Sequence, residues 1–299
     1  MSVTGGPPGR SAVLNRLQLL VSRRLDGLLQ GDYLGLLPGP GSEAGESREY
    51  VTGDDVRRMD WPVTARTAVP HVRLTVADRE LETWLAIDMS ASQSFGTAAM
   101  LKRDLAVAAA AAMTHLTVRG GNRVGAVIAC GTGGLLRRPA RGGRLAAQGL
   151  IRTIANTTAA PGACLPQLIE ALSRPPRRRG VAVVISDFLE PPQGWQRQLR
   201  KVAVRHDVLA IELLDPRELE LPDVGVLDLI DPETGAVHSV QTSDRALRER
   251  YAQAAAQQRA DVEAALRAAG ARHLRLRTDS DWLTDVVKFV VSQRFRRGR

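Results

Sequence analysis

Cysteine, lysine and aromatic residues are all scarce in this 299-residue sequence, and long hydrophobic runs are missing. Two cysteines, Cys130 and Cys164, cannot build a disulfide framework or a thiolate zinc site, and so few thiols are typical of a reducing compartment. The most apolar stretch, residues 105–118, is shorter than the roughly 20 residues that a bilayer-spanning helix needs. Residues 1–10 are rich in Gly and Pro and lack the hydrophobic region of a signal peptide. We therefore expect a cytoplasmic protein with no membrane span.

The positive charge of the chain is carried almost entirely by arginine. Lys and Arg number 41 against 32 Asp and Glu, which gives a net charge of +9, yet only three of the basic residues are lysines. Arginine clusters at 174–179 and 294–299 have almost no aromatic neighbours for stacking on bases. Because charge alone gives only weak, non-specific binding, we expect no specific nucleic-acid partner. A basic nucleic-acid-binding module stays open as an alternative, which salt-dependent DNA binding would support.

Strand and helix patterns alternate along most of the chain and predict an α/β fold. Short, continuous apolar runs indicate buried strands, at 84–87, 124–129, 181–185, 207–213 and 273–276, with a short edge strand at 135–139. Helical spacing is found between them, at 98–118, 145–154, 165–172, 195–204, 244–269 and 282–294. Buried strands interleaved with helices are typical of a parallel sheet covered on both faces. We therefore predict a doubly wound, mostly parallel sheet of the Rossmann type.

Composition suggests three parts in the chain. Residues 1–30 contain an amphipathic N-terminal helix that ends at a glycine, and residues 31–80 are rich in Gly, Pro and charge. Residues 81–299 form the α/β domain, with a hairpin inserted at 224–241 around an Asp-Pro-Glu-Thr-Gly turn. We expect residues 31–77 and this hairpin to form a small β-rich accessory lobe.

Oxygen-bearing side chains follow two of the predicted central strands. Asp88, Ser90 and Ser92 form an Asp-x-Ser-x-Ser turn after the first strand, and Asp187 follows the strand at 181–185. In an open parallel sheet, ligands bind beyond the carboxyl ends of the strands, so these groups are expected to lie close together. Carboxylates and hydroxyls suit a hard cation such as Mg²⁺. The simpler alternative is that Asp88 and Ser90 cap the following helix.

The Asp-x-Ser-x-Ser turn resembles the metal-ion-dependent adhesion site of von Willebrand factor A domains. Upstream, the sequence has Arg-Glu-Tyr at 48–50, Gly-Asp-Asp-Val-Arg-Arg-Met-Asp-Trp at 53–61 and Ala-Arg-Thr at 65–67. Together these segments resemble the signature of a bacterial family of unknown function that carries a von Willebrand A-like domain. Genes of that family typically lie beside those of MoxR-type AAA+ ATPases. The resemblance covers residues 31–283.

The resemblance implies a set of ligands for Mg²⁺. Ser90 and Ser92 would ligate the metal directly, while Asp88 and Asp187 would act through water, and a carboxylate of a partner protein would complete the shell. The family usually supplies a further Thr from a Gly-Thr-Asp-Leu-like stretch. Here the matching run is Gly-Ala-Cys-Leu at 162–165, so Ala163 replaces the ligating Thr and Cys164 is a soft substitute. Thr157 and Thr158 are the nearest other hydroxyls in the sequence.

The charged segment at 53–61 has two interpretations. In the first interpretation, its acidic and basic residues form a surface that faces a partner protein. These residues are Asp54, Asp55, Arg57, Arg58 and Asp60. In the other, the same charges pair among themselves and organise an irregular loop, while Trp61 anchors that loop in the core. Structural ion pairing is the more common arrangement.

No motif of a common enzyme class is present. A nucleophile elbow, a phosphate-binding loop and a zinc-protease motif are all missing from the sequence. We therefore predict a non-enzymatic adaptor, in which the strand-end site contacts a partner protein, either directly or through a bridging Mg²⁺. By resemblance, the partner is a MoxR-type AAA+ ATPase in a chaperone-like remodelling system, or its client. The alternative is a Mg²⁺-dependent hydrolase or phosphoryl-transfer enzyme that uses the same oxygens.

Overall fold

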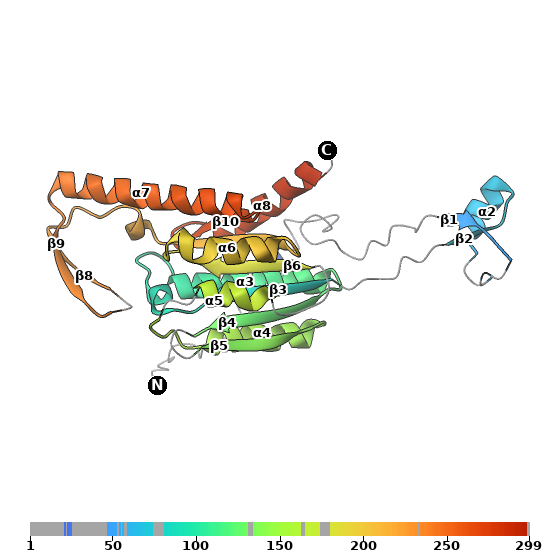
Figure 1. Cartoon of the computed structure of the whole chain (residues 1–299), viewed down its shortest axis with the longest axis horizontal. Helices are drawn as coiled ribbons and strands as arrows, with labels where there is room; N and C mark the ends of the chain where they lie inside the picture. The colour runs from blue at the N-terminus through green and yellow to red at the C-terminus, as the bar shows by residue number, and fades with distance from the viewer. Residues whose placement is uncertain are drawn as a thin grey trace, which may run out of the picture.

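A six-stranded sheet forms the centre of the computed structural model (Figure 1). The structure describes residues 21, 23–25, 47–52, 54, 56, 59–73, 81–130, 134–162, 165–173, 180–231 and 234–297. The strands lie in the order β10-β7-β6-β3-β4-β5, and their bounds are β3 (Glu82–Asp88), β4 (Arg123–Ala129), β5 (Leu135–Arg141), β6 (Val181–Ser186), β7 (Asp207–Leu214) and β10 (Arg272–Arg277). Five strands are parallel and β5 runs antiparallel to β4.

Helices cover both faces of this sheet, which confirms the predicted doubly wound α/β fold. The helices are α3 (Lys102–Arg119), α4 (Arg144–Asn156), α5 (Leu165–Ser173), α6 (Pro192–Ala203), α7 (Arg245–Ala268) and α8 (Trp282–Arg297). One hydrophobic cluster contains residues of α3, α4 and α8, and the other contains residues of α5, α6 and α7. Within the part of the chain that the structure describes, no helix is both long and apolar enough to cross a membrane.

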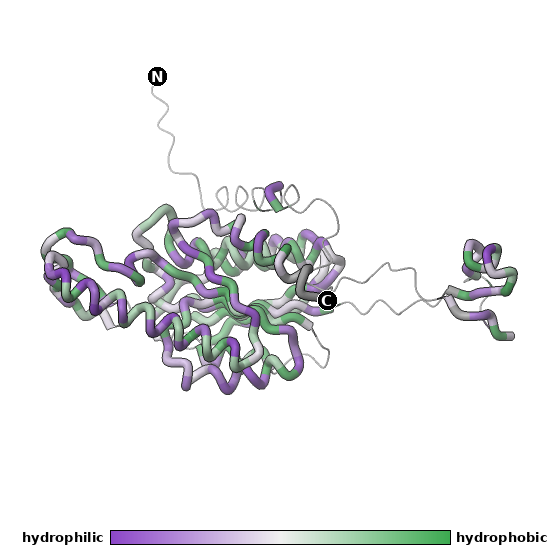
Figure 2. Tube along the Cα trace, turned by 90° about the horizontal axis from the view of Figure 1, so that it is seen from above, coloured by the Kyte–Doolittle hydropathy of each residue, from purple (hydrophilic) through white to green (hydrophobic). Residues whose placement is uncertain are grey.

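Successive side chains along the central strands point to opposite faces of the sheet and so belong to the two hydrophobic clusters in turn. In β3, Leu85 and Ile87 join the cluster under α3, while Trp84 and Ala86 join the opposite one. A strand that is buried on both faces has no polar positions to alternate with, which explains the continuous apolar runs in the sequence. Figure 2 shows these hydrophobic strands running through the middle of the domain.

The N-terminal helix is described at residues 21 and 23–25 only, and these residues are helical. Val21 and Leu25, one turn apart, are buried in the cluster under α3. Arg24 forms an ion pair of 2.8 Å with Asp281, just before α8. The apolar face predicted for this segment therefore packs on the α/β domain.

Two small antiparallel pairs lie outside the main sheet. Strands β1 (Ser47–Glu49) and β2 (His71–Arg73) pair with each other and flank α2 (Trp61–Thr67). Strands β8 (Val226–Ile230) and β9 (Val237–Gln241) form the predicted hairpin and pair with each other. Each pair is a two-stranded sheet of its own, and the accessory lobe expected from residues 31–77 and this hairpin stays a prediction.

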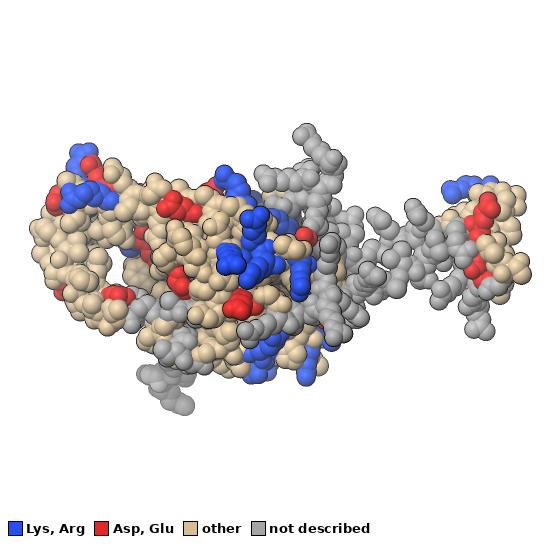
Figure 3. Space-filling model, in the orientation of Figure 1, with Lys and Arg blue, Asp and Glu red and all other residues tan. Residues whose placement is uncertain are grey.

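Arginine dominates the two edge strands of the main sheet. On β5, Arg137, Arg138 and Arg141 are exposed beside Pro139, and a register irregularity interrupts the pairing with β4. On β10, Arg275 and Arg277 are exposed, while Leu274 and Leu276 point into the core. Figure 3 shows basic side chains gathered beside β5 and α4 along the lower margin of the domain.

Candidate functional site

The register of β3 and β6 brings the two predicted aspartates to one edge of the sheet. Ile87 pairs with Ile185, so the residues that follow leave the sheet side by side. The Ser186 hydroxyl donates to Asp88 Oδ2 at 2.8 Å, and the Ser90 amide donates to Asp88 Oδ1 at 2.9 Å. Chain connections leave β3 toward β4 on one side and leave β6 toward β7 on the other, so this edge is the switch point of the fold.

The two predicted serines are bonded to each other inside the turn after β3. The Oγ atoms of Ser90 and Ser92 lie 3.0 Å apart, and both residues are buried. Ser90 precedes the 3-10 helix η2 (Ala91–Ser94) but its side chain makes no capping hydrogen bond. The next α-helix, α3, begins later and follows Leu101. The alternative in which Asp88 and Ser90 cap that helix is therefore wrong.

A lysine that the sequence analysis did not select occupies the centre of the site. Lys102 is the first residue of α3, and its side chain is completely buried. Its Nζ lies 2.7 Å from Asp187 Oδ2 and 2.5 Å from Glu218 Oε1. The same ammonium lies 5.9 Å from the centre of the Phe95 ring. The strand-end cluster is thus an ion pair of one cation with two carboxylates, beside Asp88 and the serine pair.

Glu218 is held in place by a capping box at the end of β7. Asp215 precedes the 3-10 helix η4 (Pro216–Glu218) and accepts from the Arg217 amide, while Glu218 Oε2 accepts from the Asp215 amide at 2.9 Å. Asp215 also accepts from the amide and the hydroxyl of Thr97, at 2.8 and 2.6 Å. Asp215 therefore fixes Glu218 through its amide and the loop that leads into α3 through its buried carboxylate.

Burial and neighbouring charges raise the pKa values of three groups in the cluster, for different reasons. Burial, with a smaller contribution from the Asp187 charge, raises the pKa of Asp88 to about 6. Burial lowers the pKa of Lys102, but the Asp187 and Glu218 carboxylates outweigh it and the net shift is upward. Burial raises the pKa of Glu218, against the pull of the lysine. Lys102 is therefore held in its charged form at neutral pH.

Arg259 of α7 ties the site to the far side of the sheet. Its Nη1 donates to the carbonyl oxygen of Asp187 at 2.9 Å and to Glu212 Oε1 at 2.8 Å. Glu212 lies on β7, is fully buried, and also accepts from His273 and Arg275 of β10. The backbone of the predicted ligand Asp187 is thus fixed by a buried ionic network.

The residue after Asp187 has a strained backbone. Phe188 has a φ of 51°, in the left-handed region that bulky residues avoid, although its side chain is completely buried. Its ring meets Trp195 edge to face, with centroids 5.3 Å apart. Such strain costs roughly 1–3 kcal/mol and persists where packing enforces it, most often at binding sites.

Three large apolar side chains are partly exposed on the loops that hold the ion pair, and we refer to Phe95, Leu101 and Leu189 as the apolar rim. Their exposed fractions are 36%, 38% and 39%. Phe95 accepts a hydrogen bond from the Lys102 amide through its carbonyl oxygen, at 2.9 Å, and Leu101 immediately precedes that lysine. The Leu189 amide donates to Asp187 Oδ1 at 3.4 Å. The rim residues therefore belong to the same loops as the buried pair of Lys102 and Asp187.

The expected metal ligands are already bonded within the chain. Both oxygens of Asp88 accept hydrogen bonds, the two serine hydroxyls share one, and Asp187 holds an ammonium. Unpartnered polar atoms in this turn belong to Gln93, which is not one of the predicted ligands. Across the described residues, no group of three or more His, Cys, Asp or Glu is arranged to hold a metal. While Lys102 is paired with Asp187, the arrangement does not fit a divalent cation. Mg²⁺ binding is untested and stays a prediction.

The hydroxyls considered as substitutes for the missing Thr do not complete the ligand set. Thr157 donates its hydroxyl to the Thr153 carbonyl at the end of α4, at 2.9 Å. Thr158 is exposed. Ala163 and Cys164 lie outside the described residues, although Ala160, just before them, forms a bridge with Ser90.

The described residues of the charged segment at 53–61 serve structural roles. Asp60 is buried, caps α2 through the Val63 amide and accepts from the Ser47 hydroxyl at 2.7 Å. Asp54 accepts from the Val51 amide within its own turn. Asp55, Arg57 and Arg58 lie outside the described residues. The expectation that Trp61 anchors this loop in the core is wrong, because its side chain is 67% exposed at the start of α2. The position of this aromatic ring is set by the helix that Asp60 caps.

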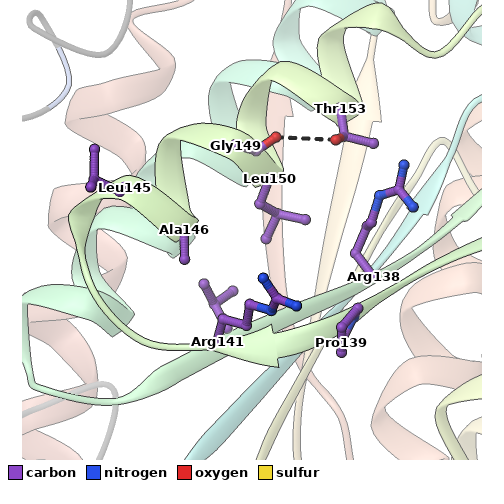
Figure 4. A pocket seen from close by; sticks show the side chains of 9 residues that line it. Arg138, Pro139, Arg141, Leu145, Ala146, Gly149, Leu150 and Thr153 are labelled. Atoms are coloured by element: carbon purple, nitrogen blue, oxygen red, sulfur yellow. Dashed lines mark hydrogen bonds between the residues drawn. The ribbon is translucent and has the colours of Figure 1, made fainter.

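An open groove lies elsewhere on the domain, between β5 and α4. Its volume is about 590 Å³, and it contains Arg138, Arg141 and Leu145 but none of the predicted site residues. Figure 4 shows the two arginines beside the helix, in which Thr153 donates to the Gly149 carbonyl. The arginine cluster at 174–179 lies outside the described residues, and so do the side chains of 294–299.

Comparison with known proteins places the chain beside relatives from mycobacteria. It is 59% identical over 290 residues to the uncharacterized protein Rv1480 of Mycobacterium tuberculosis, covering 96% of this chain and 90% of the relative. It is equally similar to the uncharacterized protein Mb1516 of Mycobacterium bovis. Over 54% of its length it is 53% identical to the uncharacterized protein MAV169 of Mycobacterium avium, of which it covers 95%.

Solved structures with a similar arrangement share little sequence with the chain. A conserved hypothetical protein, BatB of Bacteroides thetaiotaomicron, is 16% identical and covers 72% of this chain and 99% of its own, with a TM-score of 0.45. The SpRpn10 VWA domain is 14% identical and covers 70% of this chain and 94% of its own, with a TM-score of 0.39. The family model described as protein of unknown function DUF58 matches residues 46–261, from β1 to within α7. The chain is therefore a member of the DUF58 family.

Proposed function

We propose that this protein is a non-enzymatic adaptor of the von Willebrand A-like kind, which binds a partner protein at the carboxyl edge of its sheet. The observation that carries the proposal is the apolar rim, three partly exposed apolar side chains on the loops that hold a buried ion pair. Phe95, Leu101 and Leu189 are exposed on loops whose backbones contact Lys102 or Asp187. Exposed aromatic and aliphatic side chains near one another are typical of the apolar centre of protein interfaces.

The rigidity of the rim supports the same function. Asp215 fixes the loop of Phe95 through Thr97, and Arg259 fixes the backbone of Asp187 before Leu189. Interfaces whose loops are ordered before binding lose less conformational entropy on association. The strained backbone of Phe188 lies in the same loop, and backbone strain of this kind is most common at functional sites.

The partner that we propose is a MoxR-type AAA+ ATPase or its client, acting in a chaperone-like remodelling system in the cytoplasm. This choice rests on the resemblance of the signature at 48–67 and not on the site geometry. An ATPase surface with an apolar patch flanked by polar groups would suit the rim.

The experiment is a binding titration between the purified chain and the MoxR-type ATPase of the same organism, with and without EDTA. Phe95→Ser and Leu189→Ser should each weaken binding by about 10-fold or more, as expected for central contacts of an interface. The matched control is Val204→Ser, because Val204 is 74% exposed just before β7 begins, at the opposite edge of the sheet. Equal affinity of the two rim variants and the wild type would contradict the proposed site.

A further inference from the structure

We propose that Lys102 is the resident cation of the strand-end site, so that this adaptor uses an internal ammonium where its sequence motif suggests a divalent metal. The inference rests on the proposed function only in treating this cluster as the contact site. Four features of the site support this role: the position of Lys102 in its helix, its contacts, the state of the expected ligands, and the charge of the cluster.

Lys102 lies where a lysine is unfavourable for the helix itself. It is the first residue of α3, and a cation at a helix N-terminus is repelled by the helix dipole. Full burial adds a desolvation cost that lysine rarely bears without a partner. The ionic partners at this position, Asp187 and Glu218, come from the ends of β6 and β7. The two carboxylates therefore account for a buried lysine at a position that the helix itself disfavours.

The contacts of the ammonium match those of a bridging cation. It joins three segments distant in sequence: the start of α3, the residue after β6, and η4 after β7. Both carboxylates lie at the short distances of charge-assisted hydrogen bonds, and the Phe95 ring lies beside the ammonium. A metal at this edge of the sheet would have the same task of joining the strand ends.

The other expected ligand oxygens are already engaged in hydrogen bonds within the chain. Ser90 and Ser92 bond each other, and Asp88 accepts from Ser186 and from the Ser90 amide. The position of the family's ligating Thr is Ala163, which has no oxygen in its side chain. Mg²⁺ requires near-ideal octahedral oxygen geometry, and this chain lacks one expected donor while a second is paired with an ammonium.

The charge of the cluster is compatible with one internal cation. Its carboxyl groups belong to Asp88, Asp187 and Glu218, and the Lys102 ammonium lies within hydrogen-bond distance of the last two. A divalent ion added here would be repelled by the buried ammonium.

The test is a Mn²⁺ titration of the chain alone, followed by EPR. The wild type should show no saturable Mn²⁺ site tighter than about 1 mM. Lys102→Met removes the ammonium and should create one such site, and Mn²⁺ should then recover part of the melting temperature that the variant loses. Lys201→Met is the matched control, since Lys201 is exposed on α6. A saturable wild-type site that Asp187→Asn abolishes would overturn the inference, as would a folded Lys102→Met variant that binds no Mn²⁺.

A second measurement covers the case in which Lys102→Met does not fold. The chain has three lysines, and Lys201 and Lys288 are exposed. In ¹⁵N-lysine NMR spectra of the wild type, one ammonium signal should be protected from exchange, and adding Mn²⁺ should not broaden it selectively. Fast exchange of all three signals, or selective broadening, would overturn the inference. Since no partner is present, neither result decides whether the rim binds the ATPase.

Discussion

The substitution Glu212→Gln provides a direct test of the ionic network behind the site. Glu212 is fully buried, and its oxygens lie 2.8 Å from Arg259, 2.9 Å from His273 and 2.8 Å from Arg275. The amide keeps the shape of the side chain but removes its charge, and its NH₂ group cannot accept from an arginine. Arg259, itself buried, is then left without a compensating charge.

Two estimates of the cost agree. Three charge-assisted hydrogen bonds that become neutral or are lost cost about 1 kcal/mol each, which gives about 3 kcal/mol. Breaking a buried ion pair by removing one partner typically costs about 3–5 kcal/mol. We therefore expect the free energy of unfolding to fall by about 3–4 kcal/mol, and the melting temperature to fall by roughly 6–16 °C.

The assay is urea unfolding at neutral pH, and Glu263→Gln is the control. Glu263 pairs with Arg267 and Arg275 but is 42% exposed, so its loss should cost less than about 1 kcal/mol. A loss below about 1 kcal/mol for Glu212→Gln, with an unchanged m-value, would refute the reasoning.

The pH dependence of stability provides an independent check of the same carboxylate. Burial opposes the charge of Glu212, but His273, Arg275 and Arg259 outweigh it, so its pKa lies below the ordinary value of 4.5. A carboxylate with a lowered pKa stabilises the fold above its unfolded pKa, and that stabilisation is lost as the pH falls through the folded pKa. The wild type should therefore lose stability below pH 4.5 more steeply than Glu212→Gln.

Three further predictions concern the site and its surroundings. The pKa of Asp88 is raised to about 6, so its protonated form favours the folded state. The wild type should therefore lose stability as the pH rises from about 4 to 6, whereas Asp88→Asn should not. Equal slopes of the two proteins in urea unfolding across this pH range would contradict the prediction. Gly96→Ala would place a Cβ 2.6 Å from the backbone of Leu101 and should weaken partner binding more than stability, measured by the binding titration and by urea unfolding. Gly180→Ala would place a Cβ 2.1 Å from the Glu82 carbonyl and should destabilise by about 1–3 kcal/mol, whereas Gly149→Ala, in open space on α4, should stabilise by about 0.5–1 kcal/mol.

The α/β domain was predictable because its strands are buried on both faces. A run such as 181–185 has no room for polar alternation, and its length and flanking residues distinguish it from a helix. The short helix α2 was missed because it lacks any buried residue and so has no apolar period. Its start signal, an Asp followed by Trp and Pro at 60–62, was nevertheless present in the sequence.

The strand-end residues after β3 and β6 were predictable, but the ion pair was not. Asp88 and Asp187 follow apolar runs, and parallel register then brings them together. Lys102 precedes the apolar stretch at 105–118, where a charged residue looks like an ordinary flank. Only the fold reveals that it faces two strand ends. The position of Glu218 has a signal in the sequence, because Asp215 and Glu218 have the spacing of a capping box. That spacing predicts a fixed carboxylate after β7.

The arginines on β5 have a consequence for the behaviour of the protein in concentrated solution. A free sheet edge offers unpaired amides and carbonyls to the edge of another molecule, which is a route to fibrous aggregates. Here Pro139 lacks the amide needed for such pairing, and the like charges of Arg137 and Arg138 repel the same edge of a second copy. The arginine excess thus helps to keep the molecules apart, so part of the net charge is explained without invoking any ligand.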